Sequence, residues 1–281
     1  MRAYVIVDVF TDVPLEGNPV AIFTDGTGLS GETMQRAARE LNLSETVFVL
    51  PPDGEADARA RIFTPYVELP FAGHPVLGTA FVLGERSRAD ALALLTGSGL
   101  VRIALQRRHG SVVFGEMQQP IPRWEPFDRA NALLGALDVD GSQLPIEVYD
   151  NGPRHVFVAL EDETAVAKLR PNIAALTELG PVGISCFAVA DSRVKTRMFG
   201  PALGVVEDPA TGSAAGPLAV HLARHGQTRF GESIVIRQGV EIGRPSVLHA
   251  RAEGSASDVR RVIVGGGAVV VARGEYRLDG S

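Results

Sequence analysis

The segment Arg61–Ala80, "RIFTPYVELPFAGHPVLGTA", returns later in the chain as Arg197–Ala219, "RMFGPALGVVEDPATGSAAGPLA". The first matched residues lie 136 positions apart (197 minus 61) and the later ones 139 apart (207 minus 68), so a three-residue insertion separates them. An offset that persists through strand, turn and helix start indicates an internal repeat. The matched pairs are Arg61 with Arg197, Phe63 with Phe199, Pro65 with Pro201, Glu68 with Glu207, Pro70 with Pro209, and Gly73 with Gly212.

An offset close to half of the 281 residues predicts two homologous α/β halves. We place them at residues 1–126 and 127–281, and leave open the exchange of a strand or helix near the pivot at residues 146–160. Two similar halves are expected to pack about a pseudo-twofold axis, with equivalent elements on opposite walls of one cleft. The predicted fold class is therefore α+β, with the active site in that cleft.

The composition limits the classes of partner. Hydrophobic residues make up 45% of the chain and charged residues 21%, as in a globular protein, and the formal net charge is −6. An acidic balance argues against binding to nucleic acid or to an anionic membrane. No apolar run approaches the ~20 residues that span a membrane, and the first residues alternate like a strand rather than a signal peptide. We therefore expect a cytoplasmic protein.

The repeated segments each contain a predicted helix start with a small residue at its mouth. Pro75 suits a first helical turn because it lacks an N–H that this turn cannot pair within the helix. Gly73 and His74 then lie beside unpaired first-turn amides, as do Gly212 and Ser213 in the second half. Helix N-termini favour anions, so we expect a small-molecule substrate with a carboxylate. Alternatively, the glycines only permit a tight strand-to-helix turn.

Residues needed for folding should recur in both halves, whereas residues needed for chemistry at one site should not. Glu45 stands at the start of an apolar strand in "LNLSETVFVL". Burial raises the pKa of a carboxyl, which suits it to act as general base and then general acid. The unmatched positions are Glu45 facing Ile184, His74 facing Ser213, and Asp208 facing Leu69. The structural alternatives are a strand-edge or helix-end glutamate, capping roles for His74 and Ser213, and a turn or cap role for Asp208.

The other candidate residues give weaker indications of function. Cys186 is the only cysteine, which excludes an internal disulfide and any multi-cysteine metal site, and its apolar setting predicts a buried thiol. No phosphate-binding glycine loop is present, so we expect no nucleotide cofactor. His155, His221, His225 and His249 lack metal-ligand spacing with nearby acids, so we assign them solvated or structural roles and expect no metal.

The order of motifs resembles the PhzF family of phenazine-biosynthesis isomerases, which have a diaminopimelate-epimerase-like fold. The resemblance covers essentially the whole chain, and the two helix-mouth motifs are specific to the family. The motifs are "EGNPVAIF", "NLSETVFVL", "FTPYVELPFAGHPVLGTA", "NGPRHVFVAL", "EDPATGSAAGPLAVHLARHG" and "QGVEIGRPS".

The resemblance implies a cofactor-free homodimer that isomerises trans-2,3-dihydro-3-hydroxyanthranilate. It implies that Glu45 takes a proton from C3 of the ring and returns it at C1 on the same face. His74 and Asp208 match positions that hydrogen-bond and orient the substrate. Gly73, Gly212 and Ser213 match the carboxylate-binding helix mouths. A racemase of this fold with paired cysteines is disfavoured, because the helix mouths hold Gly73 and Ser213.

Three other readings stay open. Ser213, His74 and Asp208 are the residue types of a hydrolytic triad, although "TGSAAG" is not a G-x-S-x-G elbow. A binding protein that kept the cleft and lost the chemistry is another reading, which the presence of Glu45 disfavours. An isomerase of the same family that acts on another small carboxylate is the third.

Overall fold

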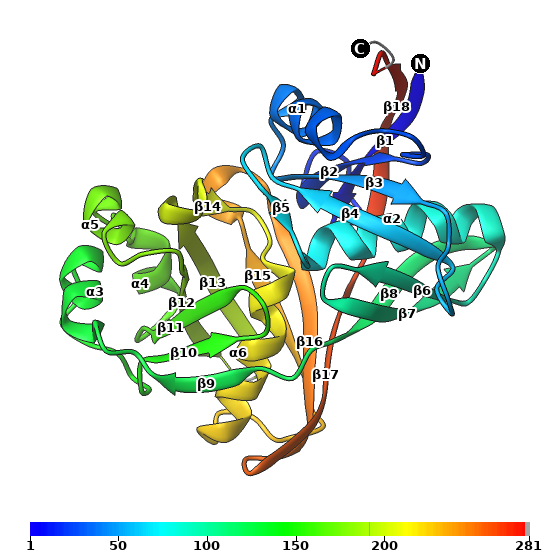
Figure 1. The fold of residues 1–281 in the computed structure, drawn as a ribbon. Helices are drawn as coiled ribbons and strands as arrows, with labels where there is room; N and C mark the ends of the chain where they lie inside the picture. Colours follow the sequence, from blue (N-terminus) through cyan, green and yellow to red (C-terminus); the bar gives the residue numbers. More distant parts are fainter. Residues whose placement is uncertain (191, 279–281) are drawn as a thin grey trace. The chain divides into compact units, whose positions relative to one another are not determined.

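A computed structural model describes residues 1–190 and 192–278. The chain divides into two compact units, one of Met1–Gln118 with the residues from Gly265 onward, and one of Gln119–Val264. Both units are mixed α/β, and their elements are labelled in Figure 1. Among the described residues, no helix is both long enough and apolar enough to cross a membrane.

The first unit combines β-strands with two helices. The helix α1 begins at Gly31, because Ser30 caps it by accepting a hydrogen bond from the Thr33 N–H at 3.1 Å. The elements are β1 (Arg2–Val9), β2 (Asn18–Phe23), α1 (Gly31–Leu41), β3 (Glu45–Leu50), β4 (Ala58–Phe63), β5 (Glu68–Leu69), α2 (Gly73–Ser87), β6 (Ala91–Thr96), β7 (Gly99–Arg108), β8 (Ser111–Gln119) and β18 (Ala268–Tyr276).

The second unit follows the same plan with more helices. Its apolar core contains Cys186, whose side chain is fully buried as predicted, and burial raises the pKa of this thiol to about 12. The elements are β9 (Arg123–Pro126), α3 (Ala130–Leu137), β10 (Glu147–Asp150), β11 (Arg154–Ala159), α4 (Glu163–Lys168), α5 (Ile173–Thr177), β12 (Gly183–Ala190), β13 (Arg193–Gly200), η1 (Pro201–Leu203), β14 (Val205–Asp208), α6 (Gly212–Arg224), β15 (Ser233–Gln238), η2 (Val240–Ile242), β16 (Ser246–Ser255) and β17 (Asp258–Gly266).

Strand pairing confirms the internal repeat. In the first unit β2 pairs in parallel with β3, β3 pairs antiparallel with β4, and β4 pairs in parallel with β6. In the second unit β11, β12, β13 and β15 pair with the same sequence of directions. The short strands β5 and β14 pair antiparallel with β4 and β13. The two repeated segments therefore occupy equivalent places in two similar sheets.

The repeated arginine and glutamate explain why these segments fold alike. Arg61 donates through Nε and Nη2 to the two carboxylate oxygens of Glu68 at 2.7 and 2.6 Å. Arg197 makes the same paired contact with Glu207, at 2.8 Å for both bonds. Each guanidinium also stacks over the phenylalanine two residues on, at 5.1 Å in the first unit and 5.0 Å in the second. This paired contact ties each strand to the turn that leads into the following helix.

The C-terminal strand belongs to the first unit. Strand β18 pairs antiparallel with β1 from Arg2 opposite Tyr276 to Val9 opposite Ala268, and the two lie side by side in Figure 1. The sequence division at residue 126 grouped β18 with the second half. The difference arises because β1 pairs with β2 along one edge and accepts β18 along the other. Pairing between strands this far apart leaves no local sequence signal.

Candidate functional site

The first unit brings Glu45 and His74 together. Glu45 is the first residue of β3, and His74 lies in the first turn of α2. The Nε2 atom of His74 lies 3.1 Å from Oε2 of Glu45, and the side chains are only 6% and 15% exposed. The strand-edge and capping alternatives for these residues do not account for this contact between two largely buried ionisable groups. Two of the predicted site residues thus meet in the interior of one unit.

The surroundings of His74 fix how it meets Glu45. Burial lowers the pKa of His74 to about 3, against the opposing effect of a hydrogen bond to the Pro19 backbone, so the ring is neutral at pH 7. Proline offers only a carbonyl, which the ring must reach with an N–H. Because Nε2 faces Glu45, the donated proton belongs on Nδ1, and Nε2 presents a lone pair. This lone pair accepts a hydrogen bond from a protonated carboxyl and repels a carboxylate oxygen.

The helix mouth beside His74 has the form expected for an anion site. Gly73 is the first residue of α2, and the preceding Ala72 provides no side-chain cap. In the second unit Gly212 begins α6, and the preceding Thr211 provides no side-chain cap either. A helix whose N-terminus lacks a side-chain cap retains first-turn N–H groups that a ligand can bind. Both glycines are buried in their units.

In the second unit Asp208 is held by a buried polar network. The hydroxyl of Thr211 donates to Oδ2 of Asp208 at 2.6 Å. The side-chain amide of Gln238 donates to the backbone carbonyl of Asp208 at 2.7 Å and to Oγ1 of Thr211 at 2.9 Å. Asp208 is 7% exposed. The network fixes the carboxylate at the end of β14, immediately before the mouth of α6.

Ser213 lies one residue into α6 and has its own buried partners. Its Oγ atom lies 3.0 Å from Nε2 of His155, and its backbone carbonyl accepts a hydrogen bond from Nδ2 of Asn151 at 3.0 Å. The carbonyl of Gly212 accepts from Nε2 of Gln119 at 2.8 Å. Asp208, Gly212 and Ser213 are thus grouped at one strand-to-helix turn. The histidine bonded to Ser213 is not the His74 of the predicted hydrolytic triad.

Sequence reasoning missed two members of this turn. It grouped His155 with structural histidines, and it did not single out Gln238, the first letter of "QGVEIGRPS". Both residues lie in motifs that carry the family resemblance, so the signal was present. The sequence does not reveal the long-range contacts that these residues make. His155 and Ser213 are 58 residues apart in the chain, and Gln238 and Asp208 are 30 apart.

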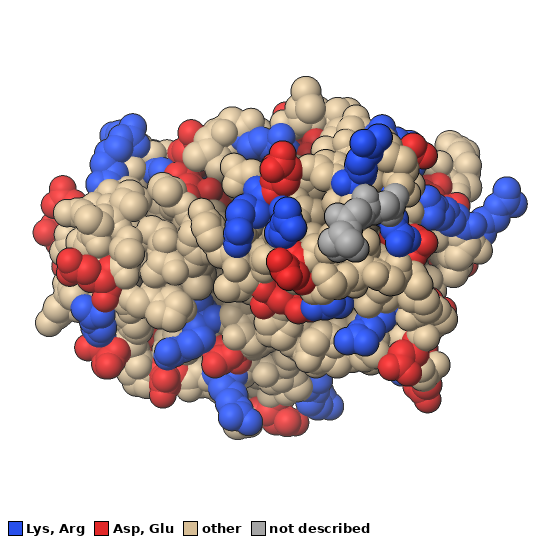
Figure 2. Space-filling view, turned by 45° about the horizontal axis from the view of Figure 1, so that its top comes forward, with Lys and Arg blue, Asp and Glu red and all other residues tan. Residues whose placement is uncertain are grey.

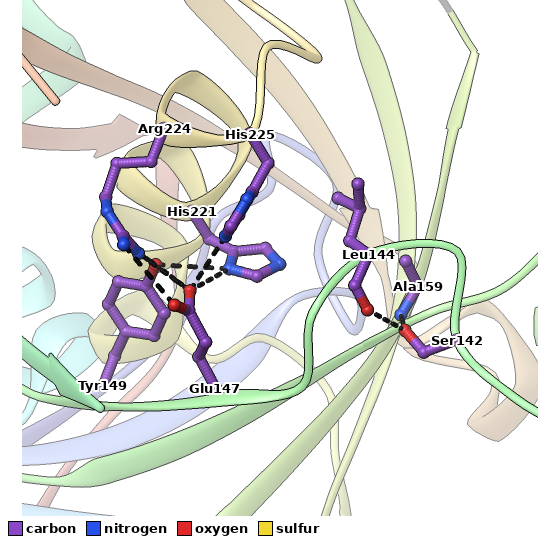
Figure 3. Close-up of polar contacts among 8 residues, drawn as sticks. All are labelled: Ser142, Leu144, Glu147, Tyr149, Ala159, His221, Arg224 and His225. Atoms are coloured by element: carbon purple, nitrogen blue, oxygen red, sulfur yellow. Dashed lines mark hydrogen bonds and ion pairs between the residues drawn. The ribbon is translucent and has the colours of Figure 1, made fainter. Parts of the chain in front are cut away.

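The prediction that the histidines lack metal-ligand spacing with nearby acids is wrong for His221 and His225, because Glu147 lies beside both. Oε2 of Glu147 lies 3.3 Å from Nδ1 of His221 and 2.9 Å from Nε2 of His225, and Figure 3 shows both rings reaching from α6 toward β10. Arg224 donates to the same oxygen at 2.7 Å, and the Tyr149 hydroxyl lies at 2.9 Å. Burial alone would raise the pKa of Glu147, but hydrogen bonds from Arg224, His225 and Tyr149 lower it to about 2.

The three donor atoms of Glu147, His221 and His225 lie within 4.8 Å of one another, a spacing that could hold a metal ion. The guanidinium of Arg224, however, is bound to the carboxylate oxygen that would be the ligand, and it would repel a second cation. Burial, together with the neighbouring His225, lowers the pKa of His221 to about 4. His221 is therefore neutral and Glu147 is ionised, and both belong to one hydrogen-bonded network with Arg224. This network joins the C-terminal end of α6 to β10.

The face shown in Figure 2 carries interspersed charge. Basic and acidic side chains alternate there, and no extended patch of one sign is visible. A phosphate backbone is normally bound by a stripe of clustered Lys and Arg. This face offers no such stripe.

Comparison with known proteins gives consistent matches. A family model described as phenazine biosynthesis-like protein matches residues 7–274. The chain is 57% identical over 278 residues to trans-2,3-dihydro-3-hydroxyanthranilate isomerase of Pseudomonas aeruginosa, which covers 99% of this chain and 100% of that protein. A PhzF-family protein of Bacillus anthracis matches with a TM-score of 0.86 and 26% identity over 98% of each chain.

A probable proline racemase from Agrobacterium radiobacter matches at the level of the fold alone. Its TM-score is 0.67 with 14% identity, over 99% of this chain and 94% of that one. The solved structures confirm the predicted fold class.

Proposed function

Because this chain belongs to the phenazine biosynthesis-like family, with its diaminopimelate-epimerase-like fold, we propose that it is a trans-2,3-dihydro-3-hydroxyanthranilate isomerase. Likeness over the full length to the Pseudomonas aeruginosa enzyme of that name supports the substrate. The buried contact of Glu45 with His74, at 3.1 Å, is the observation that supports the mechanism. In this proposal Glu45 alone carries the proton.

The reaction is one proton transfer within one molecule. Glu45 removes the proton from C3, and the electron pair of the broken C–H bond moves through the conjugated double bonds toward C1. The same carboxyl then delivers the proton to C1 on the same face, where the new C–H bond forms. The resulting enol at C3 becomes a ketone when C4 gains a proton and the hydroxyl loses one. No oxidant, reductant or group donor is needed, which supports a cofactor-independent enzyme.

His74 assists by accepting from Glu45 whenever Glu45 holds the proton. A neutral Nε2 stabilises the carboxylic acid that forms after abstraction and disfavours the free carboxylate beforehand, so it strengthens Glu45 as a base. An imidazolium at this position would do the opposite by stabilising the carboxylate. The neutral state of His74 is therefore part of the proposal.

The two helix mouths bind the group into which the negative charge moves. As the C3 proton leaves, charge delocalises through C1 into the attached carboxylate. First-turn amides at Gly73 and Gly212 and the hydroxyl of Ser213 would stabilise it there. Asp208, held by Thr211 and Gln238, would accept hydrogen bonds from the substrate's amino and hydroxyl groups. We further propose a cytoplasmic homodimer, testable by light scattering during gel filtration.

The decisive experiment mixes purified protein with trans-2,3-dihydro-3-hydroxyanthranilate in deuterated water and follows the substrate by absorbance and NMR. Wild-type protein should consume the substrate, and Glu45→Gln should lower turnover by about 10²- to 10⁴-fold, the usual contribution of a general acid–base group. Binding should survive in Glu45→Gln because the amide keeps the shape of the side chain. Dialysis against a chelator should leave the wild-type rate unchanged.

Each alternative has its own outcome. A folded wild type that binds the substrate but never consumes it is a binding protein. A wild type that neither binds nor consumes it acts on another small carboxylate. Labelling of Ser213 by a serine-directed covalent inhibitor would indicate a hydrolase. Near-normal turnover by Glu45→Gln would overturn the single-glutamate mechanism while leaving the family assignment intact.

A further inference from the structure

His155 and Ser213 form a buried pair in the second unit. His155 lies on β11 and is 2% exposed, and its Nε2 atom lies 3.0 Å from Oγ of Ser213. The Ser213 main chain is fixed separately, because Nδ2 of Asn151 donates to its carbonyl at 3.0 Å. The remaining freedom of Ser213 is the direction in which its hydroxyl proton points. His155 is the side chain placed to decide that direction.

The second ring nitrogen of His155 decides the tautomer. Nδ1 faces Gly183, its neighbour in the parallel register of β11 and β12, where an added Cβ would lie 2.6 Å away. Nδ1 has no hydrogen-bond partner among the described residues. A buried N–H without an acceptor is rarer and less tolerable than an unused lone pair. Burial also lowers the pKa of His155 to about 4, so the ring carries a single proton at pH 7. That proton belongs on Nε2.

With the proton on Nε2, the polarity of the pair follows. His155 donates to Oγ, and the serine hydroxyl keeps its own proton for another acceptor. A carboxylate is an acceptor only, so it pairs with such a hydroxyl. In the opposite tautomer Nε2 would accept a hydrogen bond from the serine hydroxyl. The Oγ lone pairs would then face the carboxylate and repel it.

We propose that His155 is a positioning residue, which orients the Ser213 hydroxyl to donate to the carboxylate of the substrate. The inference rests on the proposed function, in which Ser213 binds that carboxylate. It also disfavours Ser213 as a nucleophile. A protonated Nε2 cannot take the serine proton, and no carboxylate within the described part of the chain bonds to Nδ1 in the way a catalytic triad requires.

Binding of two matched probes tests the proposal. Anthranilate carries the substrate's amino and carboxylate groups, and anthranilamide replaces the carboxylate by a neutral amide. His155→Phe keeps a ring without a donor, whereas His155→Gln places an amide N–H near the position of Nε2. Measured by calorimetry, His155→Phe should weaken anthranilate binding about tenfold or more, because a hydrogen bond to a charged group is lost. The affinity for anthranilamide should stay unchanged. His155→Gln should restore most of the loss.

Ser213→Ala separates positioning from a merely structural role. If His155 acts through the hydroxyl, Ser213→Ala should match His155→Phe, and the double variant should be no weaker than either single variant. Equal loss of both probes in His155→Phe, additive losses in the double variant, or no rescue by a folded His155→Gln would each overturn the proposal. So would a wild type that binds both probes equally.

Turnover of the proposed substrate is a separate readout. If the wild type fails to consume trans-2,3-dihydro-3-hydroxyanthranilate but the binding pattern holds, the proposed function fails and the role of His155 stands for another carboxylate. If turnover and the effect of Glu45→Gln are as expected but the binding pattern fails, only the role of His155 is lost.

Discussion

His74 uses both ring nitrogens, one toward the Pro19 backbone and one toward Glu45. One nitrogen donates and the other can accept, which explains why a histidine rather than a simple donor occupies the mouth of α2. A lysine or arginine has no acceptor to offer. The histidine can hold its place by donating and still accept the proton of a neighbouring acid.

Separate removal of these two functions gives a prediction. His74→Asn keeps an amide N–H near the position of Nδ1 but lacks an acceptor at the position of Nε2. We expect kcat to fall by roughly tenfold to a hundredfold, less than in Glu45→Gln, because one hydrogen bond to the acid form is lost. His74→Gln should retain more activity, since its amide reaches the position of Nε2. Steady-state kinetics with thermal unfolding as a folding control measures both, and a variant His74→Asn slower than Glu45→Gln would contradict this role.

At the level of elements, α6 depends on close approach at Gly216. A Cβ there would lie 2.3 Å from Oε1 of Gln119 and 2.5 Å from Cγ1 of Val262. Gln119 is the residue that donates to the Gly212 carbonyl, so crowding at Gly216 would also disturb the mouth of the helix. The glycine is required for packing, not for backbone freedom.

We therefore expect Gly216→Ala to destabilise the protein by about 1–3 kcal/mol through overpacking, despite the better helix propensity of alanine. Gly135 in α3 is the matched control, because an added Cβ meets nothing within 4 Å. Gly135→Ala should be neutral or stabilise by up to about 1 kcal/mol. Urea unfolding of both variants checks this, and a neutral Gly216→Ala would show that Gln119 moves aside without cost.

The duplicated ion pairs allow a second comparison between elements. The side chains of Arg197 and Glu207 are 7% and 11% exposed, whereas those of Arg61 and Glu68 are 24% and 42% exposed. Loss of one partner from a buried pair leaves an uncompensated charge. Glu207→Gln should therefore cost about 3–5 kcal/mol, and Glu68→Gln about 1 kcal/mol or less. Comparison of urea midpoints provides the measurement, and equal losses would show that burial does not govern these pairs.

For the whole molecule, three buried histidines make stability depend on pH. Burial lowers the pKa of His74 to about 3, and those of His155 and His221 to about 4, from an ordinary value of 6.5. Below pH 6.5 these histidines are protonated in the unfolded chain but stay neutral in the folded chain. Stability is therefore full above pH 6.5 and decreases as the pH falls toward 4.

Each of the three should contribute a slope of up to about 1.4 kcal/mol per pH unit within that window. Urea midpoints measured from pH 7.5 to pH 4.5 should fall steadily. His155→Gln, which cannot titrate, should make the slope shallower by about one histidine. A flat profile between pH 7 and pH 5 would contradict the burial of these rings as neutral groups.

The sequence by itself determined the duplication and most of the candidate residues. Paired positions such as Arg61 and Arg197 reveal repeated units because each unit must solve the same local packing problem. Unmatched positions such as Glu45 and His74 then stand out as residues that folding does not require in both halves. These signals are local in the chain, so they survive without coordinates.

Only the tertiary structure decided which side chains meet. The contact of His155 with Ser213, the cluster of Glu147 with His221 and His225, and the pairing of β18 with β1 all join segments far apart in the chain. Burial likewise decided which histidines are neutral, since a pKa depends on the surroundings that folding creates. Long-range contacts form because they bury surface and satisfy polar groups together, and no single segment carries that information.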